Sequence, residues 1–564
     1  MRILPILLTT ASIALAPAAS AQQVNSGAYL AARQAGIESD FSAAATYFAK
    51  ALIRDSANQS LIESAMTAFL SLGDVERALP LAERLVDDNP NHQLANLTLM
   101  AEWSKTGEWD KILANLETGE KVGPLYDGLM RAWALVGLGQ MSDALEQFDV
   151  ITETRGTQAF GLYHRALALA SVGDFEGAAT VFSGENGARL GLTRSGIVAN
   201  AQVLGQLGRT DDAIALIDSA RNADRDPSLS DLRARLESGE TVDYDFVVSP
   251  AGGVAELHYS IAGAITGEAA DGYTLIYSRL SEYLRPGHID AILLSAELLE
   301  RLERYELATE VYDKVPREDP YFHAAELGRA NALRSSGRDD AAIEVLTQLS
   351  QSHGDLPIVH VSMGDLLRGL ERYQDASVAY DRAIAGLGEA EPSHWSVYFS
   401  RGITHEREDR WERAEADFRK ALELQPDQPQ VLNYLGYSFV EMQTNMDEAL
   451  DMIERAVAER PNSGYITDSL GWALYRLGQY EEAVGHMERA VELLPIDPVI
   501  NDHLGDVYWA VGRKREAEFQ WHRALSFEPE EDEAERIRRK LEVGLDVVLE
   551  EEGAPPLRVA NDEG

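Results

Sequence analysis

The 564-residue sequence contains no cysteine. This absence excludes disulfide bonds, thiol nucleophiles, cysteine-based zinc sites and lipid attachment at an N-terminal cysteine. Basic residues are scarce: 50 Lys and Arg stand against 93 Asp and Glu, which gives a formal net charge of −43. Such a charge repels nucleic acid and anionic lipid headgroups, so we expect no nucleic-acid partner. It favours a basic partner, and it also serves to keep a large exposed surface soluble.

The motifs of common enzyme classes are absent as well. There is no H-E-x-x-H, no G-x-S-x-G, no G-x-x-x-x-G-K-[ST], and no G-x-G-x-x-G after a strand. Of the 12 histidines, His486, His503 and His522 come closest to a cluster, but their spacing fits no metal motif. We therefore predict a protein that is not an enzyme and that carries no cofactor and no metal.

Long apolar segments are also lacking, and the one candidate lies at the N-terminus. Arg2 precedes an apolar stretch at residues 3–16, and Ala-Ser-Ala at 19–21 supplies the small residues of a cleavage site. The apolar stretch contains proline and is too short to span a membrane. We expect a signal peptide at 1–21 that is cleaved after export, and a soluble, periplasmic mature protein.

What the sequence does contain is an internal repeat. Between Val431 and Pro529, leucine–glycine pairs recur at spacings of 35 and 34 residues, each followed by an alanine and a closing proline. These residues are Leu435-Gly436, Leu470-Gly471 and Leu504-Gly505, then Ala449, Ala483 and Ala517, then Pro461, Pro495 and Pro529. The pattern is typical of tetratricopeptide (TPR) repeats, in which small residues let two helices cross closely and proline ends the second helix.

The same period runs along most of the chain. The residue that opens the second helix recurs at Ala44, Ala78, Ile112, Ala144, Ala178 and Ala213, and later at Ala308, Ala342, Ala376, Ala414, Ala449, Ala483 and Ala517. We predict an all-α, right-handed superhelical TPR solenoid of about 13–14 helical hairpins. Its N-terminal array occupies 22–236 and its C-terminal array 258–529.

The 34-residue repeat is interrupted between the two arrays. Residues 241–248 alternate and are rich in β-formers, and the breaker cluster Ser-Pro-Ala-Gly-Gly follows at 249–253. We predict an irregular, non-helical insert at 237–257, which is either a plain linker or hinge, or a strap lying on the solenoid. After Pro529, apolar residues at helical spacing predict a capping helix at 530–552, followed by a disordered tail at 553–564.

The first helix of each repeat lines the concave side of such arrays, and there we expect a groove that binds protein. Aromatic rings supply contact area, while amides and charged groups pair with the backbone or basic groups of an extended peptide or a docking helix. The candidates are Asn433, Tyr437, Tyr465, Asp468, Trp472, Tyr475, Arg476, Asp502, Asp506 and Trp509. Helical spacing fits an alternative equally well, in which Trp472 and Trp509 pack against neighbouring helices.

Residues Trp395 to Pro529, including GYITDSLGWALYRLGQYEEAV, resemble the C-terminal region of exported proteobacterial TPR proteins. One group in that family is an outer-membrane lipoprotein adaptor that brings cell-wall hydrolases to a periplasmic C-terminal processing protease. The resemblance implies a non-enzymatic periplasmic adaptor with these candidate partners. Without cysteine we expect no lipid anchor. The alternatives are a scaffold for envelope polysaccharide synthesis or export and, in a different class, a TPR-bearing glycosyltransferase or protease.

Overall fold

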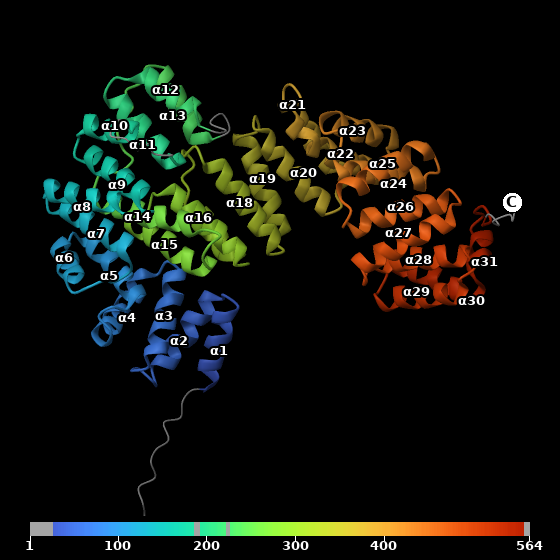
Figure 1. Ribbon diagram of the computed structural model, residues 1–564, viewed down its shortest axis with the longest axis horizontal. Coiled ribbons are helices and arrows are strands. Elements are labelled where there is room, and N and C mark those ends of the chain that lie inside the picture. The colour runs from blue at the N-terminus through green and yellow to red at the C-terminus, as the bar shows by residue number, and fades with distance from the viewer. Residues whose placement is uncertain (1–25, 185–191, 221–225, 558–564) are drawn as a thin grey trace, which may run out of the picture. The chain divides into compact units, whose positions relative to one another are not determined.

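The computed structural model describes residues 26–184, 192–220 and 226–557 (Figure 1). In these residues the regular secondary structure is helical, α1 to α31 with a short 3₁₀-helix, and no strand is present. The predicted all-α solenoid of stacked hairpins is therefore confirmed. The predicted signal peptide at 1–21 and the end of the predicted tail, 558–564, lie outside the described residues.

Contacts divide the chain into two compact units, Met1–Val345 and Leu346–Gly564, here called the first and second unit. The first unit contains α1 Ser26–Ile37, α2 Phe41–Leu52, α3 Gln59–Ser71, α4 Val75–Asp88, α5 Gln93–Thr106, α6 Trp109–Glu117, α7 Pro124–Gly137, α8 Met141–Glu153, α9 Gln158–Ser171, α10 Phe175–Ser183, α11 Arg194–Gln206, α12 Thr210–Asp218, α13 Pro227–Glu237, α14 Pro250–Ile265, α15 Asp271–Leu284, α16 Ile289–Arg301, α17 Tyr305–Tyr312 and α18 Phe322–Ser335. Helix α19, Asp339–Ser352, crosses the boundary.

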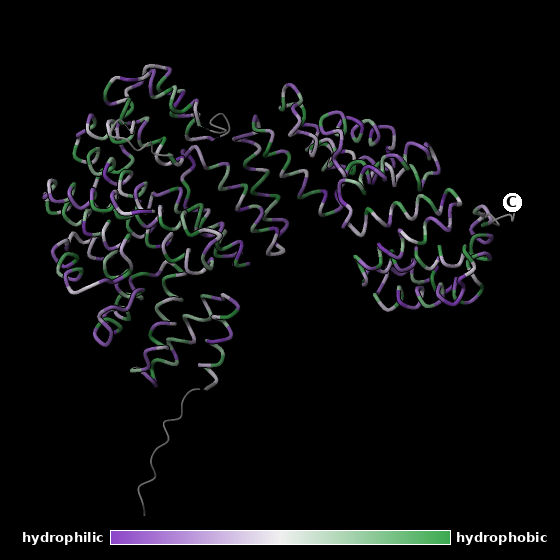
Figure 2. Tube along the Cα trace, viewed as in Figure 1, coloured by the Kyte–Doolittle hydropathy of each residue, from purple (hydrophilic) through white to green (hydrophobic). Residues whose placement is uncertain are grey.

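The second unit contains α20 Pro357–Gly369, α21 Tyr373–Gly386, the 3₁₀-helix Pro392–His394, α22 Trp395–Arg407, α23 Trp411–Leu424, α24 Pro429–Glu441, α25 Met446–Glu459, α26 Gly464–Arg476, α27 Tyr480–Leu493, α28 Pro498–Ala510, α29 Lys514–Ser526, α30 Glu531–Val543 and α31 Leu545–Glu551. Polar and apolar residues are interspersed along the helices (Figure 2). None of the helices in the described ranges combines the length and the apolar character needed to cross a bilayer.

The glycine of each leucine–glycine pair marks the close crossing of two helices. A Cβ atom on Gly505 of α28 would clash with the ring of Trp521 on α29, and one on Gly471 would clash with Met487. Trp521 and Met487 are both fully buried. The small residue on the first helix thus receives the large residue of the second, which is why the pair recurs with the repeat.

The first helices of neighbouring hairpins lie on the inner side of each stack. Helix α24 contacts α26, and α26 contacts α28. Within the described residues, the second helices of neighbouring hairpins contact each other less than these first helices do. The first helices therefore form the concave face, as the sequence predicted.

One hairpin of the first unit lies on the other hairpins rather than at the end of their stack. Helix α14 packs on α5, α7 and α9, and α15 packs on α3 and α5 (Figure 1). All of these partners are first helices, so the hairpin α14–α15 covers the inner face of the N-terminal hairpins. The array predicted for 258–529 begins inside this hairpin, so its first helices belong to the first unit.

The irregular insert is shorter than the predicted 237–257. Residues 238–249 lie outside helices, and α14 begins at Pro250. The Ser249 hydroxyl accepts a hydrogen bond from the N–H of Gly252 at 3.1 Å, and Pro250 occupies the first turn. The cluster that resembles a chain breaker is therefore a capped helix start, because proline lacks only an N–H that the first turn leaves free.

Close packing and polar contacts fix α14 to the array. A Cβ atom on Gly253 would clash with the buried ring of Trp133 on α7. The Tyr126 hydroxyl lies 3.1 Å from Nε2 of His258, and the Tyr163 hydroxyl donates to Glu256 at 2.8 Å. His258 and Glu256 are almost completely buried. The hairpin is thus an integral part of the first unit.

The substitution Gly253→Ala is expected to destabilise the first unit by about 1–3 kcal/mol, because the new methyl group forces the packed Trp133 ring to shift. The matched control is Gly263→Ala on the same helix, where a Cβ atom meets nothing within 4 Å. There the gain in helix propensity should leave the protein unchanged or up to about 1 kcal/mol more stable. Urea unfolding of both variants measures this difference, and equal stabilities would contradict the close packing.

Candidate partner-binding groove

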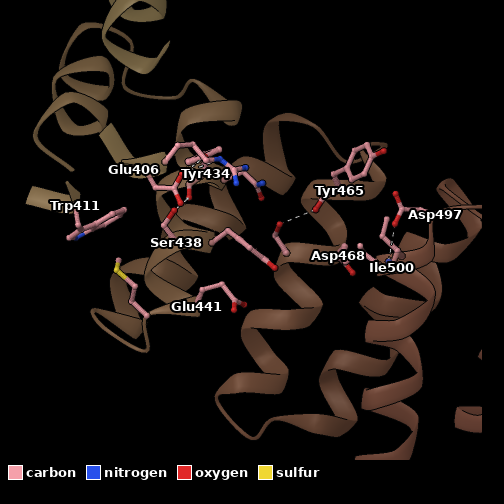
Figure 3. Close-up of a pocket in the computed structure, with 15 residues that line it drawn as sticks. Glu406, Trp411, Tyr434, Ser438, Glu441, Tyr465, Asp468, Asp497 and Ile500 are labelled. Carbon is pink, nitrogen blue, oxygen red and sulfur yellow. Dashed lines mark hydrogen bonds and ion pairs between the residues drawn. The ribbon is translucent and has the colours of Figure 1, made fainter. Parts of the chain in front are cut away.

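The inner face of the second unit carries an open groove formed by two adjoining pockets, the first of which is drawn in Figure 3. The first pocket, of about 490 Å³, is lined by Glu406, Arg407, Trp411, Asn433, Tyr434, Tyr437, Ser438, Glu441, Met442, Tyr465, Asp468, Ser469, Asp497, Val499 and Ile500. The second, of about 320 Å³, is lined by Tyr437, Glu441, Trp472, Arg476, Pro498, Val499, Asp502, His503, Glu533, Arg536 and Ile537. Tyr437, Glu441 and Val499 belong to both, so the groove is continuous from α22 to α30.

Most of the predicted binding residues line this groove. The predicted residues found there are Asn433, Tyr437, Tyr465, Asp468, Trp472, Arg476 and Asp502. Tyr465 is the most accessible of the aromatic rings, with 60% of its surface exposed. Tyr475, Asp506 and Trp509 line neither pocket. Binding of a partner by any of these residues stays a prediction.

Trp472 is part of a stack of rings within the wall of the groove. Its ring lies 4.8 Å from that of Tyr475 and 3.9 Å from that of His503, both nearly parallel. Its Nε1 donates to Oε1 of Glu441 at 2.6 Å. Trp472 is buried and stacks on His503 of the neighbouring helix α28. Its indole N–H holds the carboxylate of Glu441 in place.

His503 pairs with a carboxylate of the preceding repeat. Its Nδ1 lies 3.1 Å from Oδ2 of Asp468. Burial alone would lower the pKa of His503, but the negative charges of Asp468, Asp502 and Asp506 outweigh it and raise the pKa. In the part of the chain that the structure describes, no group of three or more His, Cys, Asp or Glu side chains is arranged to hold a metal ion.

Two of the predicted binding residues, Asp502 and Asp506, hold the last helices of the array together. Lys540 of α30 is fully buried, and its Nζ lies 2.7 Å from Oδ2 of Asp502 and from Oδ1 of Asp506. Trp521 Nε1 also donates to Asp506 at 2.9 Å. Asp506 is 1% exposed, so in this arrangement it is not accessible to a partner.

The predicted capping helix at 530–552 is two helices, α30 and α31. They are separated at Gly544, whose φ of 86° lies in a region that favours glycine. The indole Nε1 of Trp509 donates to Asp546 of α31 at 2.9 Å. The predicted binding residue Trp509 thus fastens this second helix of the cap.

Sequence reasoning missed several residues of the groove wall, chiefly Glu406, Trp411, Tyr434 and Glu441. Helical spacing could have identified two of them, Tyr434 and Glu441. Tyr434 lies three residues before Tyr437, and Glu441 lies four residues after it, so the three share one face of α24. Glu406 and Trp411 belong to the preceding repeat, and no local spacing links them to α24.

Acidic side chains dominate the first pocket. Glu406, Glu441, Asp468 and Asp497 face a single basic residue, Arg407. Burial together with the negative charge of Glu406 raises the pKa of Tyr434 to about 12. Burial together with the charges of Glu441 and Asp468 likewise raises the pKa of Tyr437. The first pocket therefore combines aromatic surface with an excess of acidic groups.

Comparison with known families agrees with this architecture. Residues 361–429 and 468–497 each match a family model described as tetratricopeptide repeat. The chain contains TPR repeats. Both models are repeat models and indicate no catalytic family, and TPR repeats support a protein-interaction scaffold.

The TPR chain is also similar to a curated protein of Pseudomonas aeruginosa, the TPR repeat-containing protein PA4667. The two are 26% identical over 159 residues, which is 28% of this chain and 26% of that protein. The similarity therefore spans about a quarter of the relative's length.

Solved TPR structures align with the chain at low scores. The APC/C hetero-tetramer Cut9–Hcn1 shows 15% identity, coverage of 92% of this chain and 96% of that chain, and a TM-score of 0.38. Yeast Tom70 shows 13% identity, coverage of 93% and 99%, and a TM-score of 0.35. YrrB, described as a TPR protein with an unusual peptide-binding site, shows 20% identity, coverage of 35% and 99%, and a TM-score of 0.28. At these scores the likenesses carry no argument about the groove.

Proposed function

We propose that this protein is a non-enzymatic scaffold that binds a protein partner in the groove of the second unit. The observation that carries the proposal is the contrast between two concave faces. In the first unit the hairpin α14–α15 covers the inner face of the N-terminal hairpins. In the second unit the inner face is hollowed into a groove lined by aromatic and charged side chains. Such lining residues are typical of protein-binding surfaces.

The cellular setting and the partners belong to the same proposal. The pattern at residues 1–21 supports export to the periplasm. The resemblance to the adaptor of a C-terminal processing protease lies at 395–529, the stretch that also forms most of the groove. A periplasmic C-terminal processing protease and cell-wall hydrolases are therefore the leading candidate partners.

A photo-crosslinking amino acid at Tyr465 is expected to capture the partner in cells, because this ring is 60% exposed at the groove. The same amino acid at Phe519 is the matched control. Phe519 is 62% exposed, but it lies on the second helix α29 and outside both pockets. Mass spectrometry of the crosslinked protein then identifies the partner.

Crosslinking to one protein from position 465 and not from 519 supports the groove as the binding site. Equal capture from both positions, or none from 465, would contradict it. A protease or a cell-wall hydrolase in the adduct supports the adaptor role. Polysaccharide-synthesis or export machinery would instead favour the alternative scaffold.

A further inference from the structure

Two carboxylates of the groove, Glu441 and Asp497, are oriented by neutral donors rather than neutralised by cations. Glu441 accepts from the indole of Trp472 at 2.6 Å, and Asp497 accepts from the backbone N–H of Ile500 at 3.0 Å. Among the described residues, neither carboxylate has an ion-pair partner. These hydrogen bonds fix the positions of the two charges but leave them able to attract a cation.

Apolar surface alternates with these charges. Tyr465 is 60% exposed, Met442 is 40% exposed, and both line the first pocket. Ile496, 72% exposed, directly precedes Asp497. Figure 3 shows Tyr465 and Asp497 at one end of the pocket, with Glu406 and Trp411 at the other. An occupant therefore meets carboxylates and apolar groups in turn along the groove.

The dimensions of the groove suit an extended chain. Its wall is built by α22, α24, α26 and α28, and packed helices lie about 8–10 Å apart. The span of about 30 Å corresponds to about nine extended residues.

An unpaired acceptor points to the same kind of occupant. Asn433 lines the first pocket, and its Oδ1 is buried without a hydrogen-bond partner among the described residues. An amide oxygen accepts hydrogen bonds, so a backbone N–H of an extended segment is a suitable partner.

From this geometry we infer that the groove takes an extended, positively charged segment of the partner protein, with Lys or Arg side chains alternating with apolar ones. The inference rests on the proposed function and specifies the chemistry of the ligand. The cationic groups lie against Glu441 and Asp497, and the apolar groups lie against Tyr465, Met442 and Ile496. The net charge of −43 attracts such a segment to the protein surface, and the side chains of the groove provide the specificity.

Fluorescence anisotropy with labelled nine-residue peptides tests this inference on the full-length protein. A peptide of alternating Lys and Val is expected to bind. The same peptide with Glu in place of Lys should not bind measurably. A peptide of alternating Lys and Ser should bind at least tenfold more weakly, because it keeps the charge but loses the apolar contacts.

The variant Glu441→Gln/Asp497→Asn should weaken binding of the Lys–Val peptide at least tenfold. Asparagine still caps a helix, and glutamine still accepts from Trp472, so the fold is retained. The matched control, Glu454→Gln/Glu482→Gln, removes the same charge from exposed positions on the second helices α25 and α27. It should change the affinity less than twofold.

Equal losses in the two variants, or equal binding of the Glu peptide, would overturn the inference. This failure is distinguishable from failure of the proposed function. If position 465 captures a partner through an acidic or uncharged segment, the groove binds protein but the assigned chemistry is wrong. If position 465 captures nothing and no peptide binds, both are wrong.

Discussion

The substitution Lys540→Ala is expected to destabilise the second unit by about 3–5 kcal/mol, because it leaves buried carboxylates without their cation. The side chain of Lys540 is 0% exposed, and its ammonium group lies within 2.9 Å of both oxygens of Asp502 and Asp506. Arg536, at 3.6 Å from Asp506 and 3.8 Å from Asp502, is too distant to replace the hydrogen bonds that Lys540 makes to them. Urea unfolding at pH 7 measures the loss.

The control for this variant lies on the same helix. Arg538→Ala removes a pair with Glu531 in which both side chains are largely exposed, and it should cost less than about 1 kcal/mol. The pH dependence supplies a second test. Burial raises the pKa of Asp506, and Lys540 opposes this shift. Without Lys540 the carboxyl group should bind a proton more readily, so the cost of the substitution should shrink as the pH falls. A cost that does not depend on pH would contradict the ion-pair explanation.

Acidification is expected to destabilise the first unit through two buried histidines, His258 on α14 and His164 on α9. Burial lowers the pKa of His164 to about 3 and that of His258 to about 4. Both rings are neutral in the folded protein at pH 7, whereas in the unfolded chain they bind protons below about pH 6.5. Their contribution to stability is therefore complete above pH 6.5 and decreases as the pH falls towards the folded-state pKa values.

Between pH 7 and pH 5 each histidine should cost about 2 kcal/mol, so the two together should cost about 4 kcal/mol. Hydrogen exchange of the α14 amides, corrected for the intrinsic effect of pH, should show the hairpin losing protection in this range. His258→Gln removes one titrating group, but its amide can still pair with the Tyr126 hydroxyl, so about half of the pH effect should disappear. His522→Gln, at an exposed position of the second unit, should leave the effect unchanged. Equal protection at pH 7 and pH 5 would contradict the prediction.

The repeat itself could be predicted because its determinants are local. Gly471 and Gly505 recur at a fixed distance from the alanines of the second helix, and the structure uses both glycines for the same close crossing. The position of α14–α15 could not be predicted in this way. Its contacts join residues far apart in the sequence, such as Tyr126 and His258, which are 132 positions apart. Helical periodicity shows that a face is buried, but not which partner buries it.

The groove likewise could be predicted only as far as local spacing allows. Its location on the first helices followed from the repeat, and Asn433, Tyr437 and Tyr465 could be identified from their helical face. Asp506 takes the position of Trp472 in the next repeat, on the helical face predicted to bind, yet it lies under the cap. The residue that decides this is Lys540, 34 positions away. Long-range charge pairing of this kind leaves no trace in the repeat pattern.

The hairpin α14–α15 also changes how the first unit responds to loss of its parts. In a simple array each repeat contacts only its neighbours, so terminal repeats can fray or be deleted one by one. Here Arg279 on α15 donates to the backbone carbonyl of Ser71 on α3, a contact that closes a loop of 208 residues. Segments that are joined in this way unfold together. The first unit should therefore unfold as one cooperative block, fold slowly and tolerate truncation poorly.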